Sequence, residues 1–139
     1  MRALALLLLL SAAPLPAGEV QVDIAGLRSA KGQVLACLTA DPRAFPDCRH
    51  DASARKLAVP APSASSLRFA AVAPGTYAVA LLHDENGNGK ADMVLMLPRE
   101  GYGFSRDAAV RMGPPRFAAA AFTVADRPVT MPIKMRYFF

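Results

Sequence analysis

After the first seventeen residues, hydrophobic and polar positions alternate along much of the chain. Val20, Val22 and Ile24 alternate with Gln21 and Asp23, as in a strand that buries one face. Six or seven such short segments, separated by turn signals, predict an all-β fold, a single antiparallel β-sandwich of about seven strands. The further strand candidates are residues 33–39, 55–59, 67–72, 77–82, 117–124 and 129–137.

The segment Tyr77–Leu82 is apolar on both faces, which predicts a central strand. Before it, Ala73-Pro74-Gly75-Thr76 predicts a type II turn with a positive φ at Gly75. The last two candidates, Phe117–Val124 and Val129–Tyr137, are expected to pair with each other across a short turn. These two strands would close the fold.

The N-terminus has the pattern of a secretory signal peptide over residues 1–17. Arg2 supplies the positive charge, Ala3–Leu10 is apolar, and Ser11–Ala17 is rich in small residues and proline. The apolar run is shorter than the roughly 18 residues that a spanning helix requires. We therefore expect cleavage after Ala17 and a periplasmic or secreted protein that does not span the membrane.

The remaining residues, 18–139, are enough for one domain with its own hydrophobic core. The net charge of the full sequence is +5, and it falls by one when Arg2 leaves. The basic residues are scattered along the chain, whereas nucleic-acid binding requires a focused basic face. We therefore exclude nucleic acid as a partner.

Cys37 and Cys48 are the only two cysteines. An even count in an exported chain predicts a disulfide, here one that closes a small ring and contributes about 2–3 kcal/mol of stability on the chain-entropy model. With ten residues between them and only His50 nearby, the two thiols have no familiar zinc spacing.

The segment 83–92 carries oxygen-bearing side chains at alternate positions, followed by Gly89 at the tight-turn position. This spacing is typical of calcium loops. At the twelfth position, where such loops carry a bidentate glutamate, the chain has Leu95, so Glu85 or Glu100 would have to fill the gap. Because the loop has few carboxylates, we expect weak binding, with a dissociation constant on the order of 10⁻⁴–10⁻³ M. The expected calcium ligands are the side chains of Asp84, Asn86, Asn88 and Asp92 and the backbone carbonyl of Lys90.

Two alternatives to a calcium site remain open. Asn-Gly is also a hairpin signal, and aspartate or asparagine side chains cap their own backbone in turns without any ion. Alternatively, His83, Asp84 and Glu100 would form the acid–base cluster of a small envelope enzyme. The usual spacing of nucleophile, base and orienting residue is absent. We therefore favour a non-enzymatic binding or accessory module.

Glycine and aromatic residues alternate in Gly101-Tyr102-Gly103-Phe104-Ser105. Such rings can form a stacking platform for a ligand, or the glycines can permit a close backbone approach while the rings pack on the core. We favour packing. The aromatic residues at 137–139 are expected to cover one end of the core.

Several of these segments together resemble the domain of unknown function 2141, a family of secreted bacterial proteins. The resemblance lies in 74–80 running into 83–90, in 98–105, and in Gly113–Phe117. It implies an exported protein with a transthyretin-like or prealbumin-like β-sandwich, and it implies no activity. Residues 93–97 are Met-Val-Leu-Met-Leu where relatives carry polar residues, which lowers the expectation of a tight ion site. The expected partner is an unidentified ligand or protein of the cell envelope.

Overall fold

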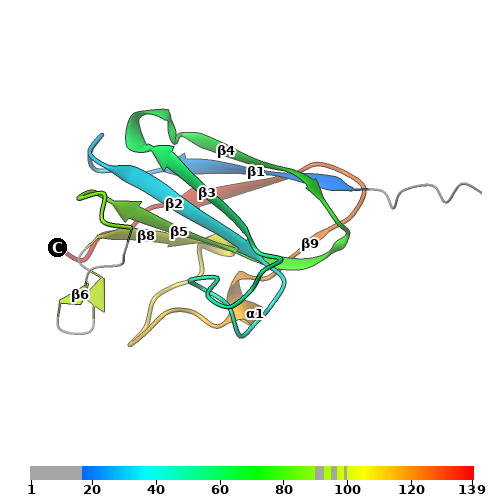
Figure 1. Ribbon diagram of the computed structural model, residues 1–139. Helices are drawn as coiled ribbons and strands as arrows, with labels where there is room; N and C mark the ends of the chain where they lie inside the picture. The colour runs from blue at the N-terminus through cyan, green and yellow to red at the C-terminus, as the bar shows by residue number, and fades with distance from the viewer. Residues whose placement is uncertain (1–16, 90–92, 95–96, 99) are drawn as a thin grey trace, which may run out of the picture.

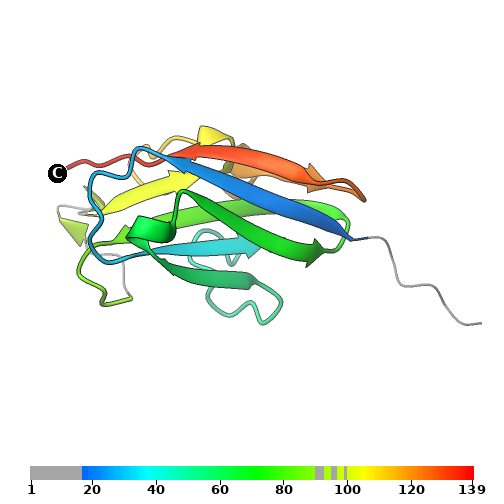
Figure 2. The same cartoon turned by 90° about the horizontal axis from the view of Figure 1, so that it is seen from above.

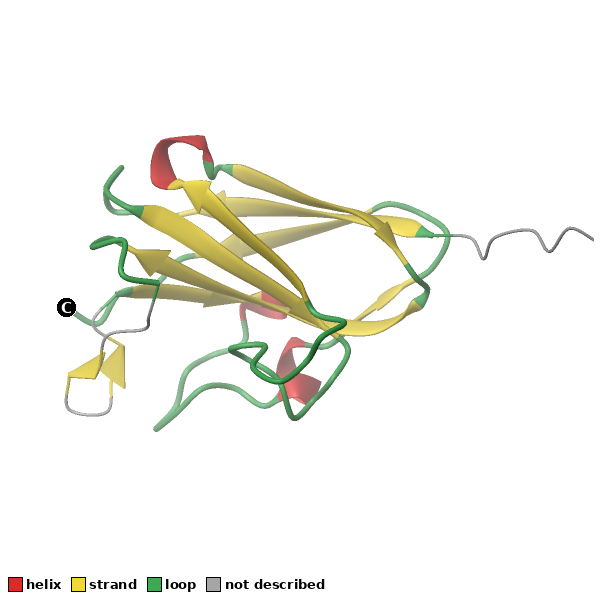
Figure 3. Ribbon diagram, viewed as in Figure 1, coloured by secondary structure: helices red, strands yellow, loops and turns green. Residues whose placement is uncertain are grey.

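The computed structural model describes residues 17–89, 93–94, 97–98 and 100–139. Over these residues the chain forms two β-sheets packed face to face, with only short helical turns (Figures 1 and 3). None of the helices in this described part is long and apolar enough to cross a membrane. Nearly all of the expected signal peptide, together with Lys90, Asp92 and Leu95, lies outside the described residues.

The smaller sheet has the strand order β10-β1-β4 within the described residues, and Figure 2 shows these strands side by side. The strand β1 is antiparallel to β4 but parallel to β10, with Val22 opposite Met131. The predicted all-β sandwich is confirmed, but the expectation that it is antiparallel is wrong for this pair. The strands are β1 (Gly18–Ala25), β4 (Ser66–Val72) and β10 (Val129–Lys134).

The larger sheet has the strand order β3-β2-β5-β8 in the described part of the chain, and β9 pairs with the start of β5. A separate small hairpin joins β6 to β7. The strands are β2 (Gln33–Thr39), β3 (Arg55–Pro60), β5 (Gly75–Asp84), β6 (Met93–Val94), β7 (Leu97–Pro98), β8 (Gly101–Phe104) and β9 (Phe122–Val124). The helical turns are η1 (Ala61–Ser63), η2 (Ser105–Asp107) and α1 (Phe117–Ala120).

The main core lies between the two sheets, because side chains alternate between the two faces of a strand. Phe69 of β4 is 1% exposed and packs with Val22 of β1, Leu38 of β2 and Val79 of β5. A second apolar cluster covers part of the outer face of the larger sheet. This cluster contains Phe45, Ala78, Ala80, Tyr102, Phe104 and Ala120.

Cys37 and Cys48 form a disulfide, with their Cα atoms 6.2 Å apart, as the sequence predicts. The bridge ties β2 to the loop that follows it, and Cys48 is fully buried. Structural disulfides are typical of oxidising compartments.

Three local predictions are wrong. Residues 117–120 are Phe-Ala-Ala-Ala, and because alanine is the best helix former they make the turn α1 in place of a strand. The remaining strand, β9, pairs with β5 and not with the last strand. Gly75 does not take a positive φ, because it already belongs to β5 and pairs there with Val124.

Candidate functional site

The strand β5 ends at Asp84, whose side chain is fully buried and organises the loop that follows. The Asp84 carboxylate accepts hydrogen bonds from the backbone N–H of Asn88 at 3.2 Å and of Gly89 at 2.7 Å. It also accepts one from the Gln33 side chain on the neighbouring strand at 3.2 Å. Asp84 therefore caps the loop as in a hairpin without an ion. A carboxylate has about four lone-pair positions, so these three bonds leave room for a further ligand.

Of the two glutamates proposed to complete a calcium site, Glu85 has another role. Its carboxylate accepts hydrogen bonds from Arg28 and, at 2.9 Å, from the Ser29 hydroxyl. These bonds direct Glu85 towards the loop before β2, so it is committed to that ion pair.

Glu100, in contrast, lies close to Asp84 in the strand register. It is 5% exposed and directly precedes Gly101, which pairs with His83. Glu100 is a bend residue just before β8, one position beyond the pairing of Gly101 with His83, while Asp84 is one position beyond His83 on β5. Two buried carboxyl residues therefore lie near the same end of the larger sheet.

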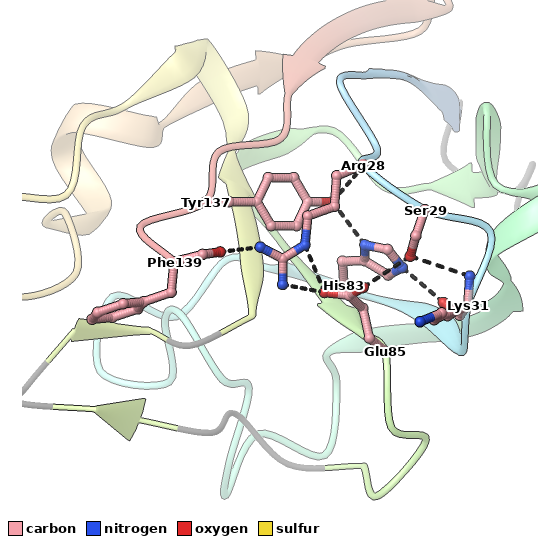
Figure 4. A network of polar contacts seen from close by, with 7 residues as sticks. All are labelled: Arg28, Ser29, Lys31, His83, Glu85, Tyr137 and Phe139. Carbon is pink, nitrogen blue, oxygen red and sulfur yellow. Dashed lines mark hydrogen bonds and ion pairs between the residues drawn. The ribbon is translucent and has the colours of Figure 1, made fainter.

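His83 points to the face of the sheet opposite to that of Asp84 and is fully buried (Figure 4). Its Nε2 donates to the backbone carbonyl of Lys31 at 2.8 Å, since a carbonyl can only accept. Its Nδ1 is 2.7 Å from the Tyr137 hydroxyl. Because both ring nitrogens have partners on the inner side, His83 does not join Asp84 and Glu100 in one acid–base cluster.

Tyr137 connects His83 to Arg28, and the contacts form a network that holds the C-terminal segment (Figure 4). The Arg28 guanidinium lies 4.4 Å from the centroid of the Tyr137 ring and donates to Glu85 and to the backbone oxygen of Phe139. Burial raises the pKa of Tyr137 above its usual value of 10.0, so its hydroxyl stays protonated. Sequence spacing carries no signal for this network, because its members come from three segments that lie more than fifty positions apart.

This network predicts a pH-dependent contribution from Glu85. The Arg28 hydrogen bond holds the pKa of Glu85 below its ordinary value of 4.5. A depressed pKa adds stability above the unfolded-state pKa, and that stability is lost as the pH falls through the folded-state pKa. The variant Glu85→Gln should therefore be less stable than wild type near neutral pH, and the difference should shrink below about pH 4 in urea unfolding.

The matched control for that experiment removes the cause of the shift. In an Arg28→Gln background, the effect of Glu85→Gln on stability should depend less on pH, because the hydrogen bond and charge of Arg28 are gone and only the weaker Ser29 hydrogen bond still lowers the pKa of Glu85. A wild-type difference that stays constant from neutral to acid pH would contradict the assignment.

An apolar groove runs across the outer face of the larger sheet and encloses about 700 Å³. Leu35 of β2, Leu82 of β5 and Phe104 of β8 line it. The loop between β2 and β3 and the loop before α1 contribute to its walls, and both lie on the side of this sheet away from β1 (Figure 1). Gly89 also lines the groove, so the Asp84 loop borders it.

In the segment Gly101–Phe104 the glycines permit a close approach and the aromatic rings pack, which is the alternative that we favoured from the sequence. A Cβ on Gly101 would lie 2.3 Å from Cε1 of Tyr137, so the glycine permits that ring to approach. Tyr102 and Phe104 are 7% and 6% exposed and belong to the second apolar cluster. Of the three C-terminal rings, only Tyr137 packs against the main core. Phe138 stacks on Tyr102 with ring centroids 5.4 Å apart, but Phe138 and Phe139 stay exposed.

Comparison with known proteins identifies a family but no activity. The model of one family, described as "Uncharacterized protein conserved in bacteria (DUF2141)", matches residues 22–132. No curated protein and no solved structure matches the chain, so its likeness to transthyretin stays a prediction. The match covers most of the chain and includes both sheets and the Asp84 loop. The chain therefore belongs to the DUF2141 family of bacterial proteins.

Proposed function

We propose that this chain is a non-enzymatic binding protein of the bacterial cell envelope, exported by its signal peptide and carrying a weak calcium site at the Asp84 loop. The observation that carries the proposal is the position of that loop. It contains a buried carboxylate, it lies near Glu100 at the same end of the larger sheet, and it borders the outer-face groove through Gly89. An ion at this loop would stabilise one end of a ligand-binding surface.

The donor set supports a hard cation. Calcium takes six to eight oxygen ligands, preferably carboxylates, amide carbonyls and backbone carbonyls. Asp84 and Glu100 supply two carboxylates, and Asn86 and Asn88 follow in the exposed turn. A divalent cation between neighbouring carboxylates offsets the repulsion between their charges. Lys90 and Asp92, from the expected ligand set, complete the proposed site.

The positions of His83 and the disulfide support the other parts of the proposal. His83 is held by Lys31 and Tyr137 on the inner face, which is a structural role. The Cys37–Cys48 bridge is typical of proteins outside the reducing cytosol. The first observation disfavours the acid–base cluster of an envelope enzyme, and the second favours an exported protein.

The test is thermal unfolding of the oxidised protein in calcium and in EDTA. At a free calcium concentration about a hundredfold above the dissociation constant, binding should add about 2.7 kcal/mol of stability and raise the melting temperature by several degrees. Isothermal titration with calcium supplies the dissociation constant. The variant Asp84→Ala should melt at one temperature in both solutions.

Because Asp84 also caps the loop, Asp84→Ala will be destabilised in EDTA as well, so the informative quantity is the calcium response. Asp126→Asn removes an exposed carboxylate outside the loop and should keep the full response. If wild type melts identically in calcium and in EDTA, the loop is a hairpin without an ion and the calcium proposal fails.

A further inference from the structure

The outer-face groove has the size and shape of a small-molecule site. Its volume of about 700 Å³ falls within the roughly 300–1,000 Å³ that is usual for ligand pockets. It crosses four neighbouring strands, β3, β2, β5 and β8. Three inter-strand spacings make it about 14 Å long in that direction. A protein partner would instead require a broad surface of about 800 Å² on each side.

The lining of the groove is apolar because two strands of the larger sheet carry apolar residues on their outer face, which a two-layer sandwich does not need for its core. A sheet with one wet face alternates apolar and polar residues, yet β2 and β5 are apolar on both faces. The second apolar cluster covers only part of the outer face. Leu35, Leu82 and Val110 stay half-exposed in the groove, and accessible apolar surface of this kind marks binding sites.

The charged residues that line the groove give it a net positive character. Arg49 and Asp47 form an ion pair at 3.2 Å, so their charges offset each other. Lys56 projects from the edge strand β3, is exposed, and has no ion pair within the described residues. A ligand with one negative group can form an ion pair with Lys56, which a neutral or cationic ligand cannot.

We propose that the groove binds a single-chain alkyl carboxylate, with its chain over Leu35, Leu82 and Phe104 and its carboxylate at the Lys56 ammonium. A saturated chain of roughly a dozen carbons is about as long as the groove is across its strands. The apolar chain supplies affinity through burial, and the charge pair selects the carboxylate end. This inference deepens the proposed binding role and rests on it, but it does not require the calcium ion.

The test is isothermal titration of the oxidised protein with dodecanoate below its micelle concentration. We expect saturable binding to one site. Dodecanol, which has the same chain without the charge, should bind about three- to fivefold more weakly, as should dodecanoate to Lys56→Gln. The matched control is Lys134→Gln, which removes an exposed lysine from β10 of the other sheet and should bind as wild type does.

A second variant tests the groove itself. Ala58 is exposed on the edge strand β3 and lines the groove, so Ala58→Trp should fill it and abolish binding while the protein stays folded by circular dichroism. Absence of saturable dodecanoate binding overturns the proposal. Equal affinities for Lys56→Gln and Lys134→Gln overturn the role of Lys56, and unchanged binding to Ala58→Trp overturns the location.

The titrations are repeated in calcium and in EDTA so that the two proposals are separated. If dodecanoate binds in neither solution but calcium still raises the melting temperature, the ligand class is overturned and the calcium proposal is supported. Dodecanoate binding in both solutions, without any calcium response, supports the ligand class and overturns the ion site. Dimers that block dodecanoate from the groove, detected by light scattering, would show that a second copy occupies it and would overturn the proposal.

Discussion

Replacing Gly32 with alanine should lower the free energy of unfolding by about 3 kcal/mol and the melting temperature by about 10 °C. Gly32 has a φ of +66°, and a Cβ there would lie 2.0 Å from the backbone oxygen of Asp84 and 2.7 Å from Cα of Glu85. Both are main-chain atoms, so the added carbon forces the start of β2 and the end of β5 apart. Urea and thermal unfolding measure the loss.

The control for this prediction is Gly87→Ala. Gly87 has a similar φ of +68°, but a Cβ there meets nothing within 4 Å. Only the strain of the left-handed backbone remains, which costs about 1 kcal/mol. Equal losses for the two variants would contradict the close approach of Gly32 to Asp84. Because Gly32→Ala displaces Asp84, it should also reduce the calcium response proposed for the loop.

The strands that follow from local pattern were predicted well. Residues 33–39 form β2 with the expected bounds, and the apolar run 77–82 lies inside β5 (Gly75–Asp84). An alternating segment has one buried face, and a segment that is apolar throughout has two. Local pattern therefore predicts such strands, because it depends on which faces are buried. The disulfide followed from the count of cysteines alone.

The pairing of the last strands could not be read from local pattern. The strand β10 pairs in parallel with β1, more than a hundred positions away, and nothing within Val129–Lys134 specifies that partner. The helix α1 fell inside an apolar run, where periodicity over a few residues does not separate strand from helix. Pairing is decided by the whole sandwich, since every strand must bury one face against the other sheet.

The position of the loop after Asp84 could be predicted from local pattern, whereas the neighbours of that loop could not. The loop after Asp84 was located by its glycines and oxygen-bearing residues, which act over a few positions. The placement of Glu100 at the same end of the sheet as Asp84 depends on the register between β5 and β8. The role of Glu85 depends on Arg28, which lies 57 positions earlier. Neither of these two placements can be predicted from the spacing of residues around position 84.

The variant His83→Ala should lower the free energy of unfolding by about 3–4 kcal/mol without a separate effect on ligand binding by the folded protein. His83 is a fully buried side chain, so its removal leaves a cavity among packed neighbours. It also removes two part-buried hydrogen bonds, although the Tyr137 hydroxyl keeps the one from the backbone N–H of Arg28. Each hydrogen bond contributes about 0.5–1.5 kcal/mol.

Tyr137→Phe separates the hydrogen bond from the cavity in this cluster. It keeps the ring that packs against Gly101 and Arg28 and deletes only the hydroxyl that meets His83, so it should cost about 1–2 kcal/mol. In the double variant with His83→Ala the two losses should not add, because they share one hydrogen bond. Additive losses, or a folded His83→Ala protein of wild-type stability, would contradict the structural role of His83. A wild-type-stable variant that no longer bound dodecanoate would instead place the histidine in the binding chemistry.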